Sequence, residues 1–182
     1  MTEGALLTVG HGTLNRDAFA NLVVSAQIGL LVDVRSYPGS RRVPHMARTA
    51  LEKWLPDAGV DYRWEPRLGG RRRTSPGSVN VALEHPSFRG YADYMTSPEF
   101  AEARAQLVID ARERRTVIMC AESVWWRCHR RLIADSVMLL DRLPVAHLFH
   151  DGRLVPHTPM PVARIDGLHL VYDLMADAPL PI

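Results

Sequence analysis

The chain has 182 residues, of which 47% are hydrophobic and 23% are charged, a composition typical of one globular domain with its own core. Its 22 basic residues face 20 acidic ones, so a net charge of +2 excludes the strong positive field of a protein that wraps duplex nucleic acid. Every basic residue except Lys53 is an arginine. A GC-rich coding sequence explains such an excess as a whole, so only the positions of the arginines bear on function.

Two features of the sequence bear on where the protein resides. Cys120 and Cys128 are too few for a disulfide-stapled secreted domain, and their apolar neighbours fit a reducing compartment. The first residues lack the basic and apolar regions of a signal peptide, and every apolar run is shorter than the about 20 residues that span a membrane. We therefore expect a cytoplasmic protein without membrane contact.

The first third of the chain predicts a strand, a helix and a second strand. Residues 6–9 form a short apolar run, and Thr13 is a candidate N-cap for a helix over 19–26 that Gly29 would close. Residues 30–34 are apolar but for one acid, as in a strand buried on both faces. This order predicts a parallel pair of strands joined by a right-handed crossover.

The middle of the chain predicts shorter elements between loops. Residues 36–48 contain prolines and arginines and predict a loop, followed by a helix over 49–58 and a strand over 60–64. Residues 66–86 have little apolar content and predict a long loop. Its arginine run, 71–73, is either a solvated charge run or a binding site for a nucleotide or single-stranded nucleic acid.

The last part of the chain returns to regular elements. Ser97 followed by proline predicts the start of a helix, residues 116–121 predict a strand, and residues 128–134 predict the onset of another helix. Two apolar runs flank a turn at 150–153, which predicts a hairpin. We assign no regular element to residues 165–182.

Together these elements predict a single α/β domain over residues 1–182, with a mostly parallel sheet flanked by helices and a C-terminal hairpin. The core of this domain is expected at about residues 7–152, with a C-terminal extension over 153–182. The apolar tail of the extension is a candidate surface for self-association into a homo-oligomer.

Several short motifs occur in an order that is specific as a set, although each alone is a weak signal. They are Thr8-Val9-Gly10-His11, Asp33-Val34-Arg35 with Pro38, Ser40 and Arg41, Leu68-Gly69-Gly70, Tyr91-Ala92-Asp93-Tyr94-Met95, Met119-Cys120-Ala121-Glu122 and Cys128-His129-Arg130. Through these motifs the chain resembles the domain-of-unknown-function family 488, from about residue 7 to 152. The resemblance implies a compact α/β fold and no particular reaction.

Three of these motifs follow predicted strands, and the carboxyl ends of parallel strands meet at the sheet edge where ligands bind. Arginine side chains and helix N-termini both bind phosphate, so we expect a cleft there for a small anionic ligand that is phosphate- or nucleotide-like. The expected ligand-binding residues are Asp33, Arg35, Ser40, Arg41, Cys128, His129 and Arg130. The competing interpretation is that Asp33, Arg35, Glu122 and Arg130 pair with one another as a buried structural network.

Three residues at the same edge are candidates for catalysis. Cys120, at a strand end near a helix N-terminus, is the candidate nucleophile, and His11 or Glu122 would transfer the proton. Cysteine phosphatases place an arginine six residues after the nucleophile, whereas here Arg127 lies seven residues after Cys120. A buried structural thiol is therefore the alternative interpretation of Cys120.

Two other classes of function stay open at this point. In a non-catalytic module, the same cleft would bind a nucleotide or nucleic acid without turning it over. In a metal- or haem-dependent enzyme, Cys120, Cys128 and His129 would be ligands, with His11 or His147 completing the site. The eight-residue step between the cysteines is not that of a zinc knuckle. We therefore assign no metal ligand and no cofactor from the sequence.

Overall fold

A computed structural model describes residues 4–39 and 41–173. Helices and strands alternate through most of this chain, as the sequence predicts, with three-residue 3₁₀ turns at Pro44–Met46 (η1), Pro66–Leu68 (η2) and Trp125–Arg127 (η3). In chain order the elements are β1 (Leu6–Gly10), α1 (Arg16–Ser25), β2 (Leu30–Asp33), α2 (Arg48–Asp57), β3 (Asp61–Trp64), α3 (Pro86–Tyr94), α4 (Pro98–Glu113), β4 (Thr116–Cys120), α5 (Arg130–Asp141), β5 (Val145–Leu148), β6 (Leu154–Pro156), β7 (Ala163–Asp166) and β8 (His169–Tyr172).

The first six strands form one sheet in the order β3-β2-β4-β1-β5-β6. The first five of these are parallel to one another, and β6 is antiparallel to β5, so a mostly parallel α/β fold is confirmed. The direct β1–β2 pair expected from the sequence is wrong, because β4 lies between those two strands. Residues 116–119 are buried throughout, and a strand this apolar is best accommodated at the centre, covered on both faces.

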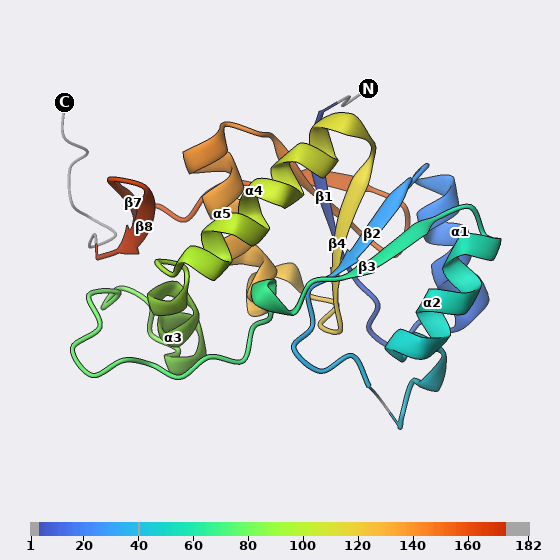
Figure 1. Ribbon diagram of the computed structural model, residues 1–182, viewed down its shortest axis with the longest axis horizontal. Coiled ribbons are helices and arrows are strands. Elements are labelled where there is room, and N and C mark those ends of the chain that lie inside the picture. The colour runs from blue at the N-terminus through green and yellow to red at the C-terminus, as the bar shows by residue number, and fades with distance from the viewer. Residues whose placement is uncertain (1–3, 40, 174–182) are drawn as a thin grey trace.

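Helices cover both faces of this sheet (Figure 1). Alternate residues of each strand point to opposite faces, so neighbours such as Leu6 and Leu7 enter different clusters. One cluster joins Leu7, Leu31 and Val117 to α1 and α2 through Phe19, Leu22, Leu51 and Leu55. The other joins Leu6, Val32 and Ile118 to α3, α4 and α5 through Tyr91, Phe100, Leu107, Leu132 and Val137. The sheet therefore lies between two layers of helices.

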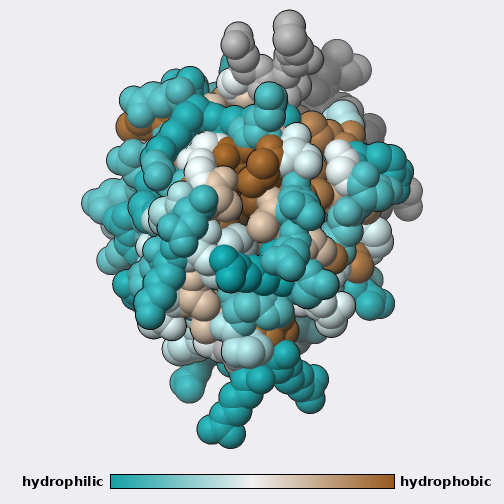
Figure 2. All heavy atoms as spheres, turned by 90° about the vertical axis from the view of Figure 1, so that its right-hand side faces the viewer, coloured by the Kyte–Doolittle hydropathy of each residue, from teal (hydrophilic) through white to brown (hydrophobic). Residues whose placement is uncertain are grey.

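The outer surface of α1 and α2 is mostly polar. Figure 2 shows this face of the molecule, where hydrophilic side chains predominate and hydrophobic ones gather mainly above the centre, with smaller groups towards the edges. Within residues 4–39 and 41–173, each helix is too short or too polar to cross a membrane.

The limits of α1 differ from those expected. Asn15, not Thr13, caps the helix, since its side-chain oxygen accepts a hydrogen bond from the Ala18 amide at 2.8 Å. The helix ends at Ser25 with Ala26 as its C-cap, and Gln27, not Gly29, takes a left-handed conformation (φ 56°) directly after it. Gly29 lies beyond the helix, where its amide bonds to the Arg115 carbonyl at 2.9 Å and aligns β2 beside β4.

The C-terminal part of the chain holds more structure than its sequence indicates. The predicted hairpin around 150–153 is confirmed as β5–β6. The absence of structure assigned to 165–182 is wrong for its first part, because β7 and β8 form a second hairpin with a turn at Gly167. Two four-residue strands carry little periodicity of their own, and this pair is held by packing on α5. Residues 174–182 lie outside the described residues.

Candidate functional site

Three loops meet at the carboxyl ends of β1, β2 and β4, as the sequence predicts. Gly10 lies opposite Cys120 in the sheet, and Asp33 lies opposite Met119. The pairing continues beyond the strands, where the His11 amide bonds to the Cys120 carbonyl at 3.0 Å. The segments that follow the three strands therefore start side by side.

A cleft of about 1000 Å³ opens at this edge. Its lining comes from the three strand-end loops, from residues 70–73 and from the start of α3. We call it the arginine-lined cleft, because Arg35, Arg71, Arg72, Arg73 and Arg127 all line it. The candidate site residues that also line it are Cys120, Glu122, Cys128 and His129.

The remaining candidate residues lie elsewhere. His11 and Asp33 are buried behind the cleft and are not part of its described lining. Arg41 is exposed and also lies outside this lining. Arg130 is 1% exposed and borders a different pocket. Ser40 lies outside the described residues, so its expected contact with an anion stays a prediction.

Asp33 and Arg35 form a buried ion pair that is already satisfied. The guanidinium donates two hydrogen bonds to the carboxylate, from Nε to Oδ1 at 2.8 Å and from Nη2 to Oδ2 at 2.6 Å, and the Tyr62 hydroxyl donates to Oδ2 at 2.8 Å. Arg35 Nη1 also donates to Nε2 of His11 at 3.2 Å. This pair matches the structural interpretation of the sequence and leaves Arg35 little charge for an external anion.

The proposed four-residue network does not extend to Glu122 and Arg130. Arg130 Nη2 donates to the backbone carbonyl of Glu122, not to its carboxylate, and Arg130 Nε donates to Sγ of Cys128 at 3.4 Å. The Glu122 carboxylate instead accepts a hydrogen bond from the Val124 amide at 3.1 Å. Arg130 is thus buried, and its hydrogen bond to Glu122 holds the loop after β4 in place.

His11 is held in one neutral tautomer. Its Nδ1 donates to the Gly12 carbonyl at 2.9 Å, so Nε2 is left as the acceptor for Arg35. Burial and the adjacent Arg35 charge lower the pKa of His11 from 6.5 to about 4. Both ring nitrogens have protein partners, and the proton-transfer role expected for His11 stays a prediction.

The two cysteines form an unequal pair. A hydrogen bond from the Cys120 thiol, together with His129 and Arg130, holds the pKa of Cys128 well below its usual value against the opposing effect of burial. The same interaction with Cys128, and burial, raise the pKa of Cys120. These interactions favour the thiolate at Cys128, whereas the candidate nucleophile from the sequence is Cys120. The catalytic roles expected for Cys120 and Glu122 stay predictions.

The sequence left Arg71, Arg72 and Arg73 open between a solvated charge run and a nucleotide contact, and it did not place Arg127 in the site. The first three lie in the long loop after β3, where periodicity gives no guide to tertiary position. Gly70 directly before this run belongs to the Leu68-Gly69-Gly70 motif, and in the structure a Cβ there would lie 2.4 Å from Nδ1 of His129. The close approach carries the arginine run to the cleft.

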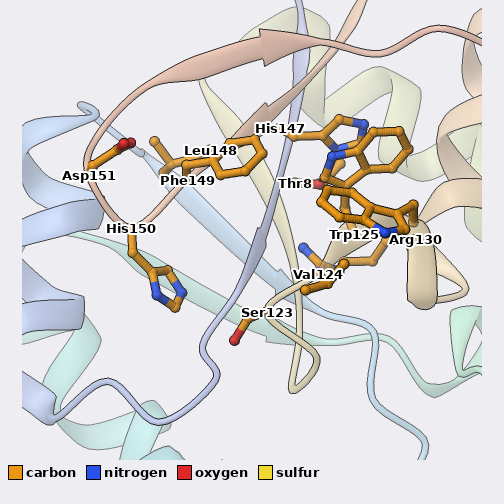
Figure 3. Close-up of a pocket in the computed structure, with 11 residues that line it drawn as sticks. Thr8, Ser123, Val124, Trp125, Arg130, His147, Leu148, Phe149, His150 and Asp151 are labelled. Atoms are coloured by element: carbon orange, nitrogen blue, oxygen red, sulfur yellow. The ribbon is translucent and has the colours of Figure 1, made fainter.

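A second pocket, of about 300 Å³, lies on the other side of the loop after β4, and its lining includes Trp125, Phe149 and His147 (Figure 3). The Trp125 and His147 rings stack at 3.8 Å between centroids. Ser123 is common to the linings of both pockets. This aromatic pocket was not predicted, because its residues come from separate loops and strands.

A chain of buried hydrogen bonds runs from this pocket into the core. Thr8 Oγ1 lies 2.7 Å from Nδ1 of His147, whose Nε2 lies 2.9 Å from Nδ1 of His157. The Nε2 of His157 donates to Asp135 Oδ1 at 2.7 Å. Because the carboxylate only accepts, Nε2 of His157 carries the hydrogen of this bond. Burial, His157 and Arg130 lower the pKa of His147 to about 3.

The lowered pKa values of His11 and His147 predict a loss of stability in mild acid. The pKa values of His11 (about 4) and His147 (about 3) lie below the 6.5 of an unfolded chain, so the unfolded state takes up protons first as the pH falls. Each histidine contributes stability that is present above about pH 6.5 and is lost towards its folded pKa. Between pH 7.5 and 5 we expect a loss of about 2 kcal/mol for each, measured by urea unfolding.

A pair of variants isolates this effect. His11→Asn removes one titrating group, so its free energy of unfolding should fall by about 2 kcal/mol less than that of the wild type between the two pH values. His85→Asn changes an exposed histidine and should leave the wild-type pH dependence in place. An unchanged pH dependence in His11→Asn would contradict the neutral assignment.

Comparison with protein families gives a match. Residues 15–137 match the model of a family described as a domain of unknown function, DUF488. Curated proteins and solved structures gave no match.

Proposed function

The chain belongs to the DUF488 family, whose name assigns no activity, and we propose from the site itself that the arginine-lined cleft binds a phosphate-bearing ligand of nucleotide size. The observation that carries this proposal is the charge of the lining. In the described part of the chain, Arg71, Arg72, Arg73 and Arg127 have no carboxylate partner, and Glu122 is the one acidic residue beside them. Four guanidinium groups without a carboxylate partner favour a polyanion.

The arginine run is held in position before any ligand binds. Arg72 donates to the carbonyls of Gly69 at 3.1 Å and Pro66 at 3.2 Å, and its guanidinium lies 3.6 Å from the centroid of the Tyr94 ring. Beyond the run, the Ser75 amide donates to Asp93 at 2.9 Å. Little side-chain and loop entropy is therefore lost when Arg72 meets an anion.

Aromatic rings beside these charges favour a nucleotide over a bare anion. Tyr37 lines the cleft with 74% of its surface exposed, and Arg71 lies 5.6 Å from its ring centroid. Phe88, at the start of α3, lines the same cleft. An exposed ring of this kind offers a stacking face for a nucleobase. The volume of about 1000 Å³ is also larger than a single phosphate needs.

Isothermal titration calorimetry with ADP, pyrophosphate and adenosine tests the proposal. We expect the two phosphate-bearing ligands to bind, and adenosine to bind at least about tenfold more weakly than ADP. The double variant Arg71→Gln/Arg73→Gln should weaken ADP binding by about tenfold or more, because two unpaired charges are lost.

Arg112→Gln is the matched control, since Arg112 is exposed on α4 and lies outside the described lining of the cleft. It should bind ADP like the wild type. The proposal fails if neither ADP nor pyrophosphate binds, or if the double variant binds ADP as tightly as the control.

A further inference from the structure

Three metal-ligating side chains converge on the floor of the arginine-lined cleft. The thiol sulfurs of Cys120 and Cys128 and a ring nitrogen of His129 all lie within 4.8 Å of one another. Within residues 4–39 and 41–173, this is the group of histidine, cysteine and acidic side chains that comes close enough to share one ion. We propose that these three residues bind one thiophilic divalent cation, Zn²⁺ above all, with a fourth coordination position open to the cleft.

The spacing of the ligand atoms matches a tetrahedral site. Zn–S and Zn–N bonds of about 2.3 and 2.05 Å at a tetrahedral angle place sulfur and nitrogen about 3.6 Å apart. The structure has Sγ of Cys128 at 3.5 Å from Nδ1 of His129. Two sulfurs on one zinc ion lie about 3.8 Å apart, so the cysteine pair needs to close by at most about 1 Å.

The histidine is presented in the way that metal ligands usually are. His129 Nε2 donates to the backbone carbonyl of Val34 at 3.0 Å, which leaves the lone pair on Nδ1, the nitrogen beside Cys128. Backbone carbonyls commonly fix ligating histidines by this contact. Tyr91 packs against the ring with 5.1 Å between centroids.

Gly70 completes this support without blocking the lone pair. A Cβ at this position would lie 2.4–2.9 Å from three ring atoms at once, so the glycine packs over the face of the His129 ring. The Nδ1 lone pair lies in the ring plane and stays directed at the thiols. The ring therefore has one accessible orientation, and this orientation serves the proposed ion.

The fourth position follows from where the three residues lie. All three line the arginine-lined cleft, so an ion held by them faces the cleft on its remaining side. Three protein ligands with one open position are typical of catalytic zinc sites, in which water or substrate binds the ion. This part of the inference rests on the proposed function, since the ligand of the open position would be a phosphate oxygen held by the arginines. Binding of the ion itself does not depend on it.

The test measures metal binding by the full chain. After purification under reducing conditions and removal of metal with a chelator, Zn²⁺ should rebind at about one ion per chain. Co²⁺ in the same site should give thiolate-to-cobalt charge-transfer absorption and the strong visible bands of a tetrahedral ion. Because thiols must deprotonate to bind, metal binding should also release protons.

Ligand variants should abolish this signature. Cys120→Ser, Cys128→Ser and His129→Asn are each expected to weaken Co²⁺ binding by about a hundredfold or more, beyond the 10- to 100-fold typical of losing an outer partner. Cys120 is the less buried of the two cysteines, so Cys120→Ser gives a reading if Cys128→Ser does not fold. Circular dichroism checks the fold of each variant. His85→Asn, the same change at an exposed position, should retain one Co²⁺ per chain with the wild-type spectrum.

The outcomes separate the two proposals. A folded, reduced wild-type chain that binds less than about a tenth of an equivalent of Zn²⁺ overturns the metal site. A Co²⁺ spectrum that is unchanged in folded His129→Asn does so as well. If Arg71→Gln/Arg73→Gln retains the Co²⁺ spectrum while neither ADP nor pyrophosphate binds the wild type, the metal site stands and the proposed function falls.

Discussion

Asp135→Ala is expected to lower the free energy of unfolding by about 3–5 kcal/mol, because it removes the acceptor at the end of a buried chain. The Asp135 side chain is fully buried and accepts hydrogen bonds from three groups: His157 Nε2 at 2.7 Å, the Met160 amide at 3.2 Å and the Tyr172 hydroxyl at 3.1 Å. The methyl group of alanine leaves all three donors without this acceptor. Urea unfolding at pH 7.5, followed by tryptophan fluorescence, measures the loss.

Two further variants separate hydrogen bonding from simple loss of volume. Asp135→Asn keeps one acceptor oxygen in nearly the same shape, so it should cost about 1–2 kcal/mol. Asp57→Ala removes an exposed carboxylate at the end of α2 and should change stability by less than about 0.5 kcal/mol. If Asp135→Ala unfolds within 1 kcal/mol of the wild type, the buried chain has no role in holding β8 on α5.

The order of the strands shows where sequence reasoning stops. Periodicity and capping signals are local, so the helix after Ser97 and the strand at 116–121 were predictable. The position of β4 between β1 and β2 was not, because strand order depends on which surfaces pack best over long sequence separations. The second hairpin was missed for the same reason, since Tyr172 reaches its buried partner Asp135 only in three dimensions.

The candidate site was likewise predictable from the sequence only in part. Loops after parallel strands share one edge of a sheet, so Cys120 and His129 could be expected near one cleft. Their approach to within 4.8 Å depends on the η3 turn, which folds the eight-residue step from Cys120 to Cys128 back on itself. Neither the spacing of the two cysteines nor the composition of the segment between them predicts that this segment folds back.

The structure also shows which members of the arginine excess have partners inside the protein and which line the cleft. Arg35 and Arg130 have carboxylate or loop partners inside the protein, whereas the cleft arginines without a carboxylate partner are Arg71, Arg72, Arg73 and Arg127. Three of these lie in a loop whose sequence resembles an ordinary solvated charge run. A guanidinium next to a strand end is thus poor evidence for anion binding until its partners are known.

Gly10→Ala is expected to have the other large effect, because β1 ends where the loop after β4 crosses it. A Cβ at this position would lie 1.9 Å from the Glu122 carbonyl oxygen and 2.8 Å from Nη2 of Arg130. The first of these atoms is backbone, so the loop itself must move. Such overpacking costs about 3 kcal/mol or more in urea unfolding. The same shift displaces Cys120 from Cys128, so the Co²⁺ affinity should fall together with stability.

Gly29→Ala is the control for this change, because a Cβ there meets its nearest neighbour, the Arg115 carbonyl oxygen, at an ordinary 3.7 Å. It should leave both stability and Co²⁺ binding close to those of the wild type. A stable Gly10→Ala protein that still binds Co²⁺ would show that the loop after β4 tolerates movement, and that the approach of Glu122 to β1 does not hold the cysteine pair together. Loss of Co²⁺ binding in a variant that remains folded at low urea would instead tie the site to this single contact, because the substitution leaves every ligand residue in place.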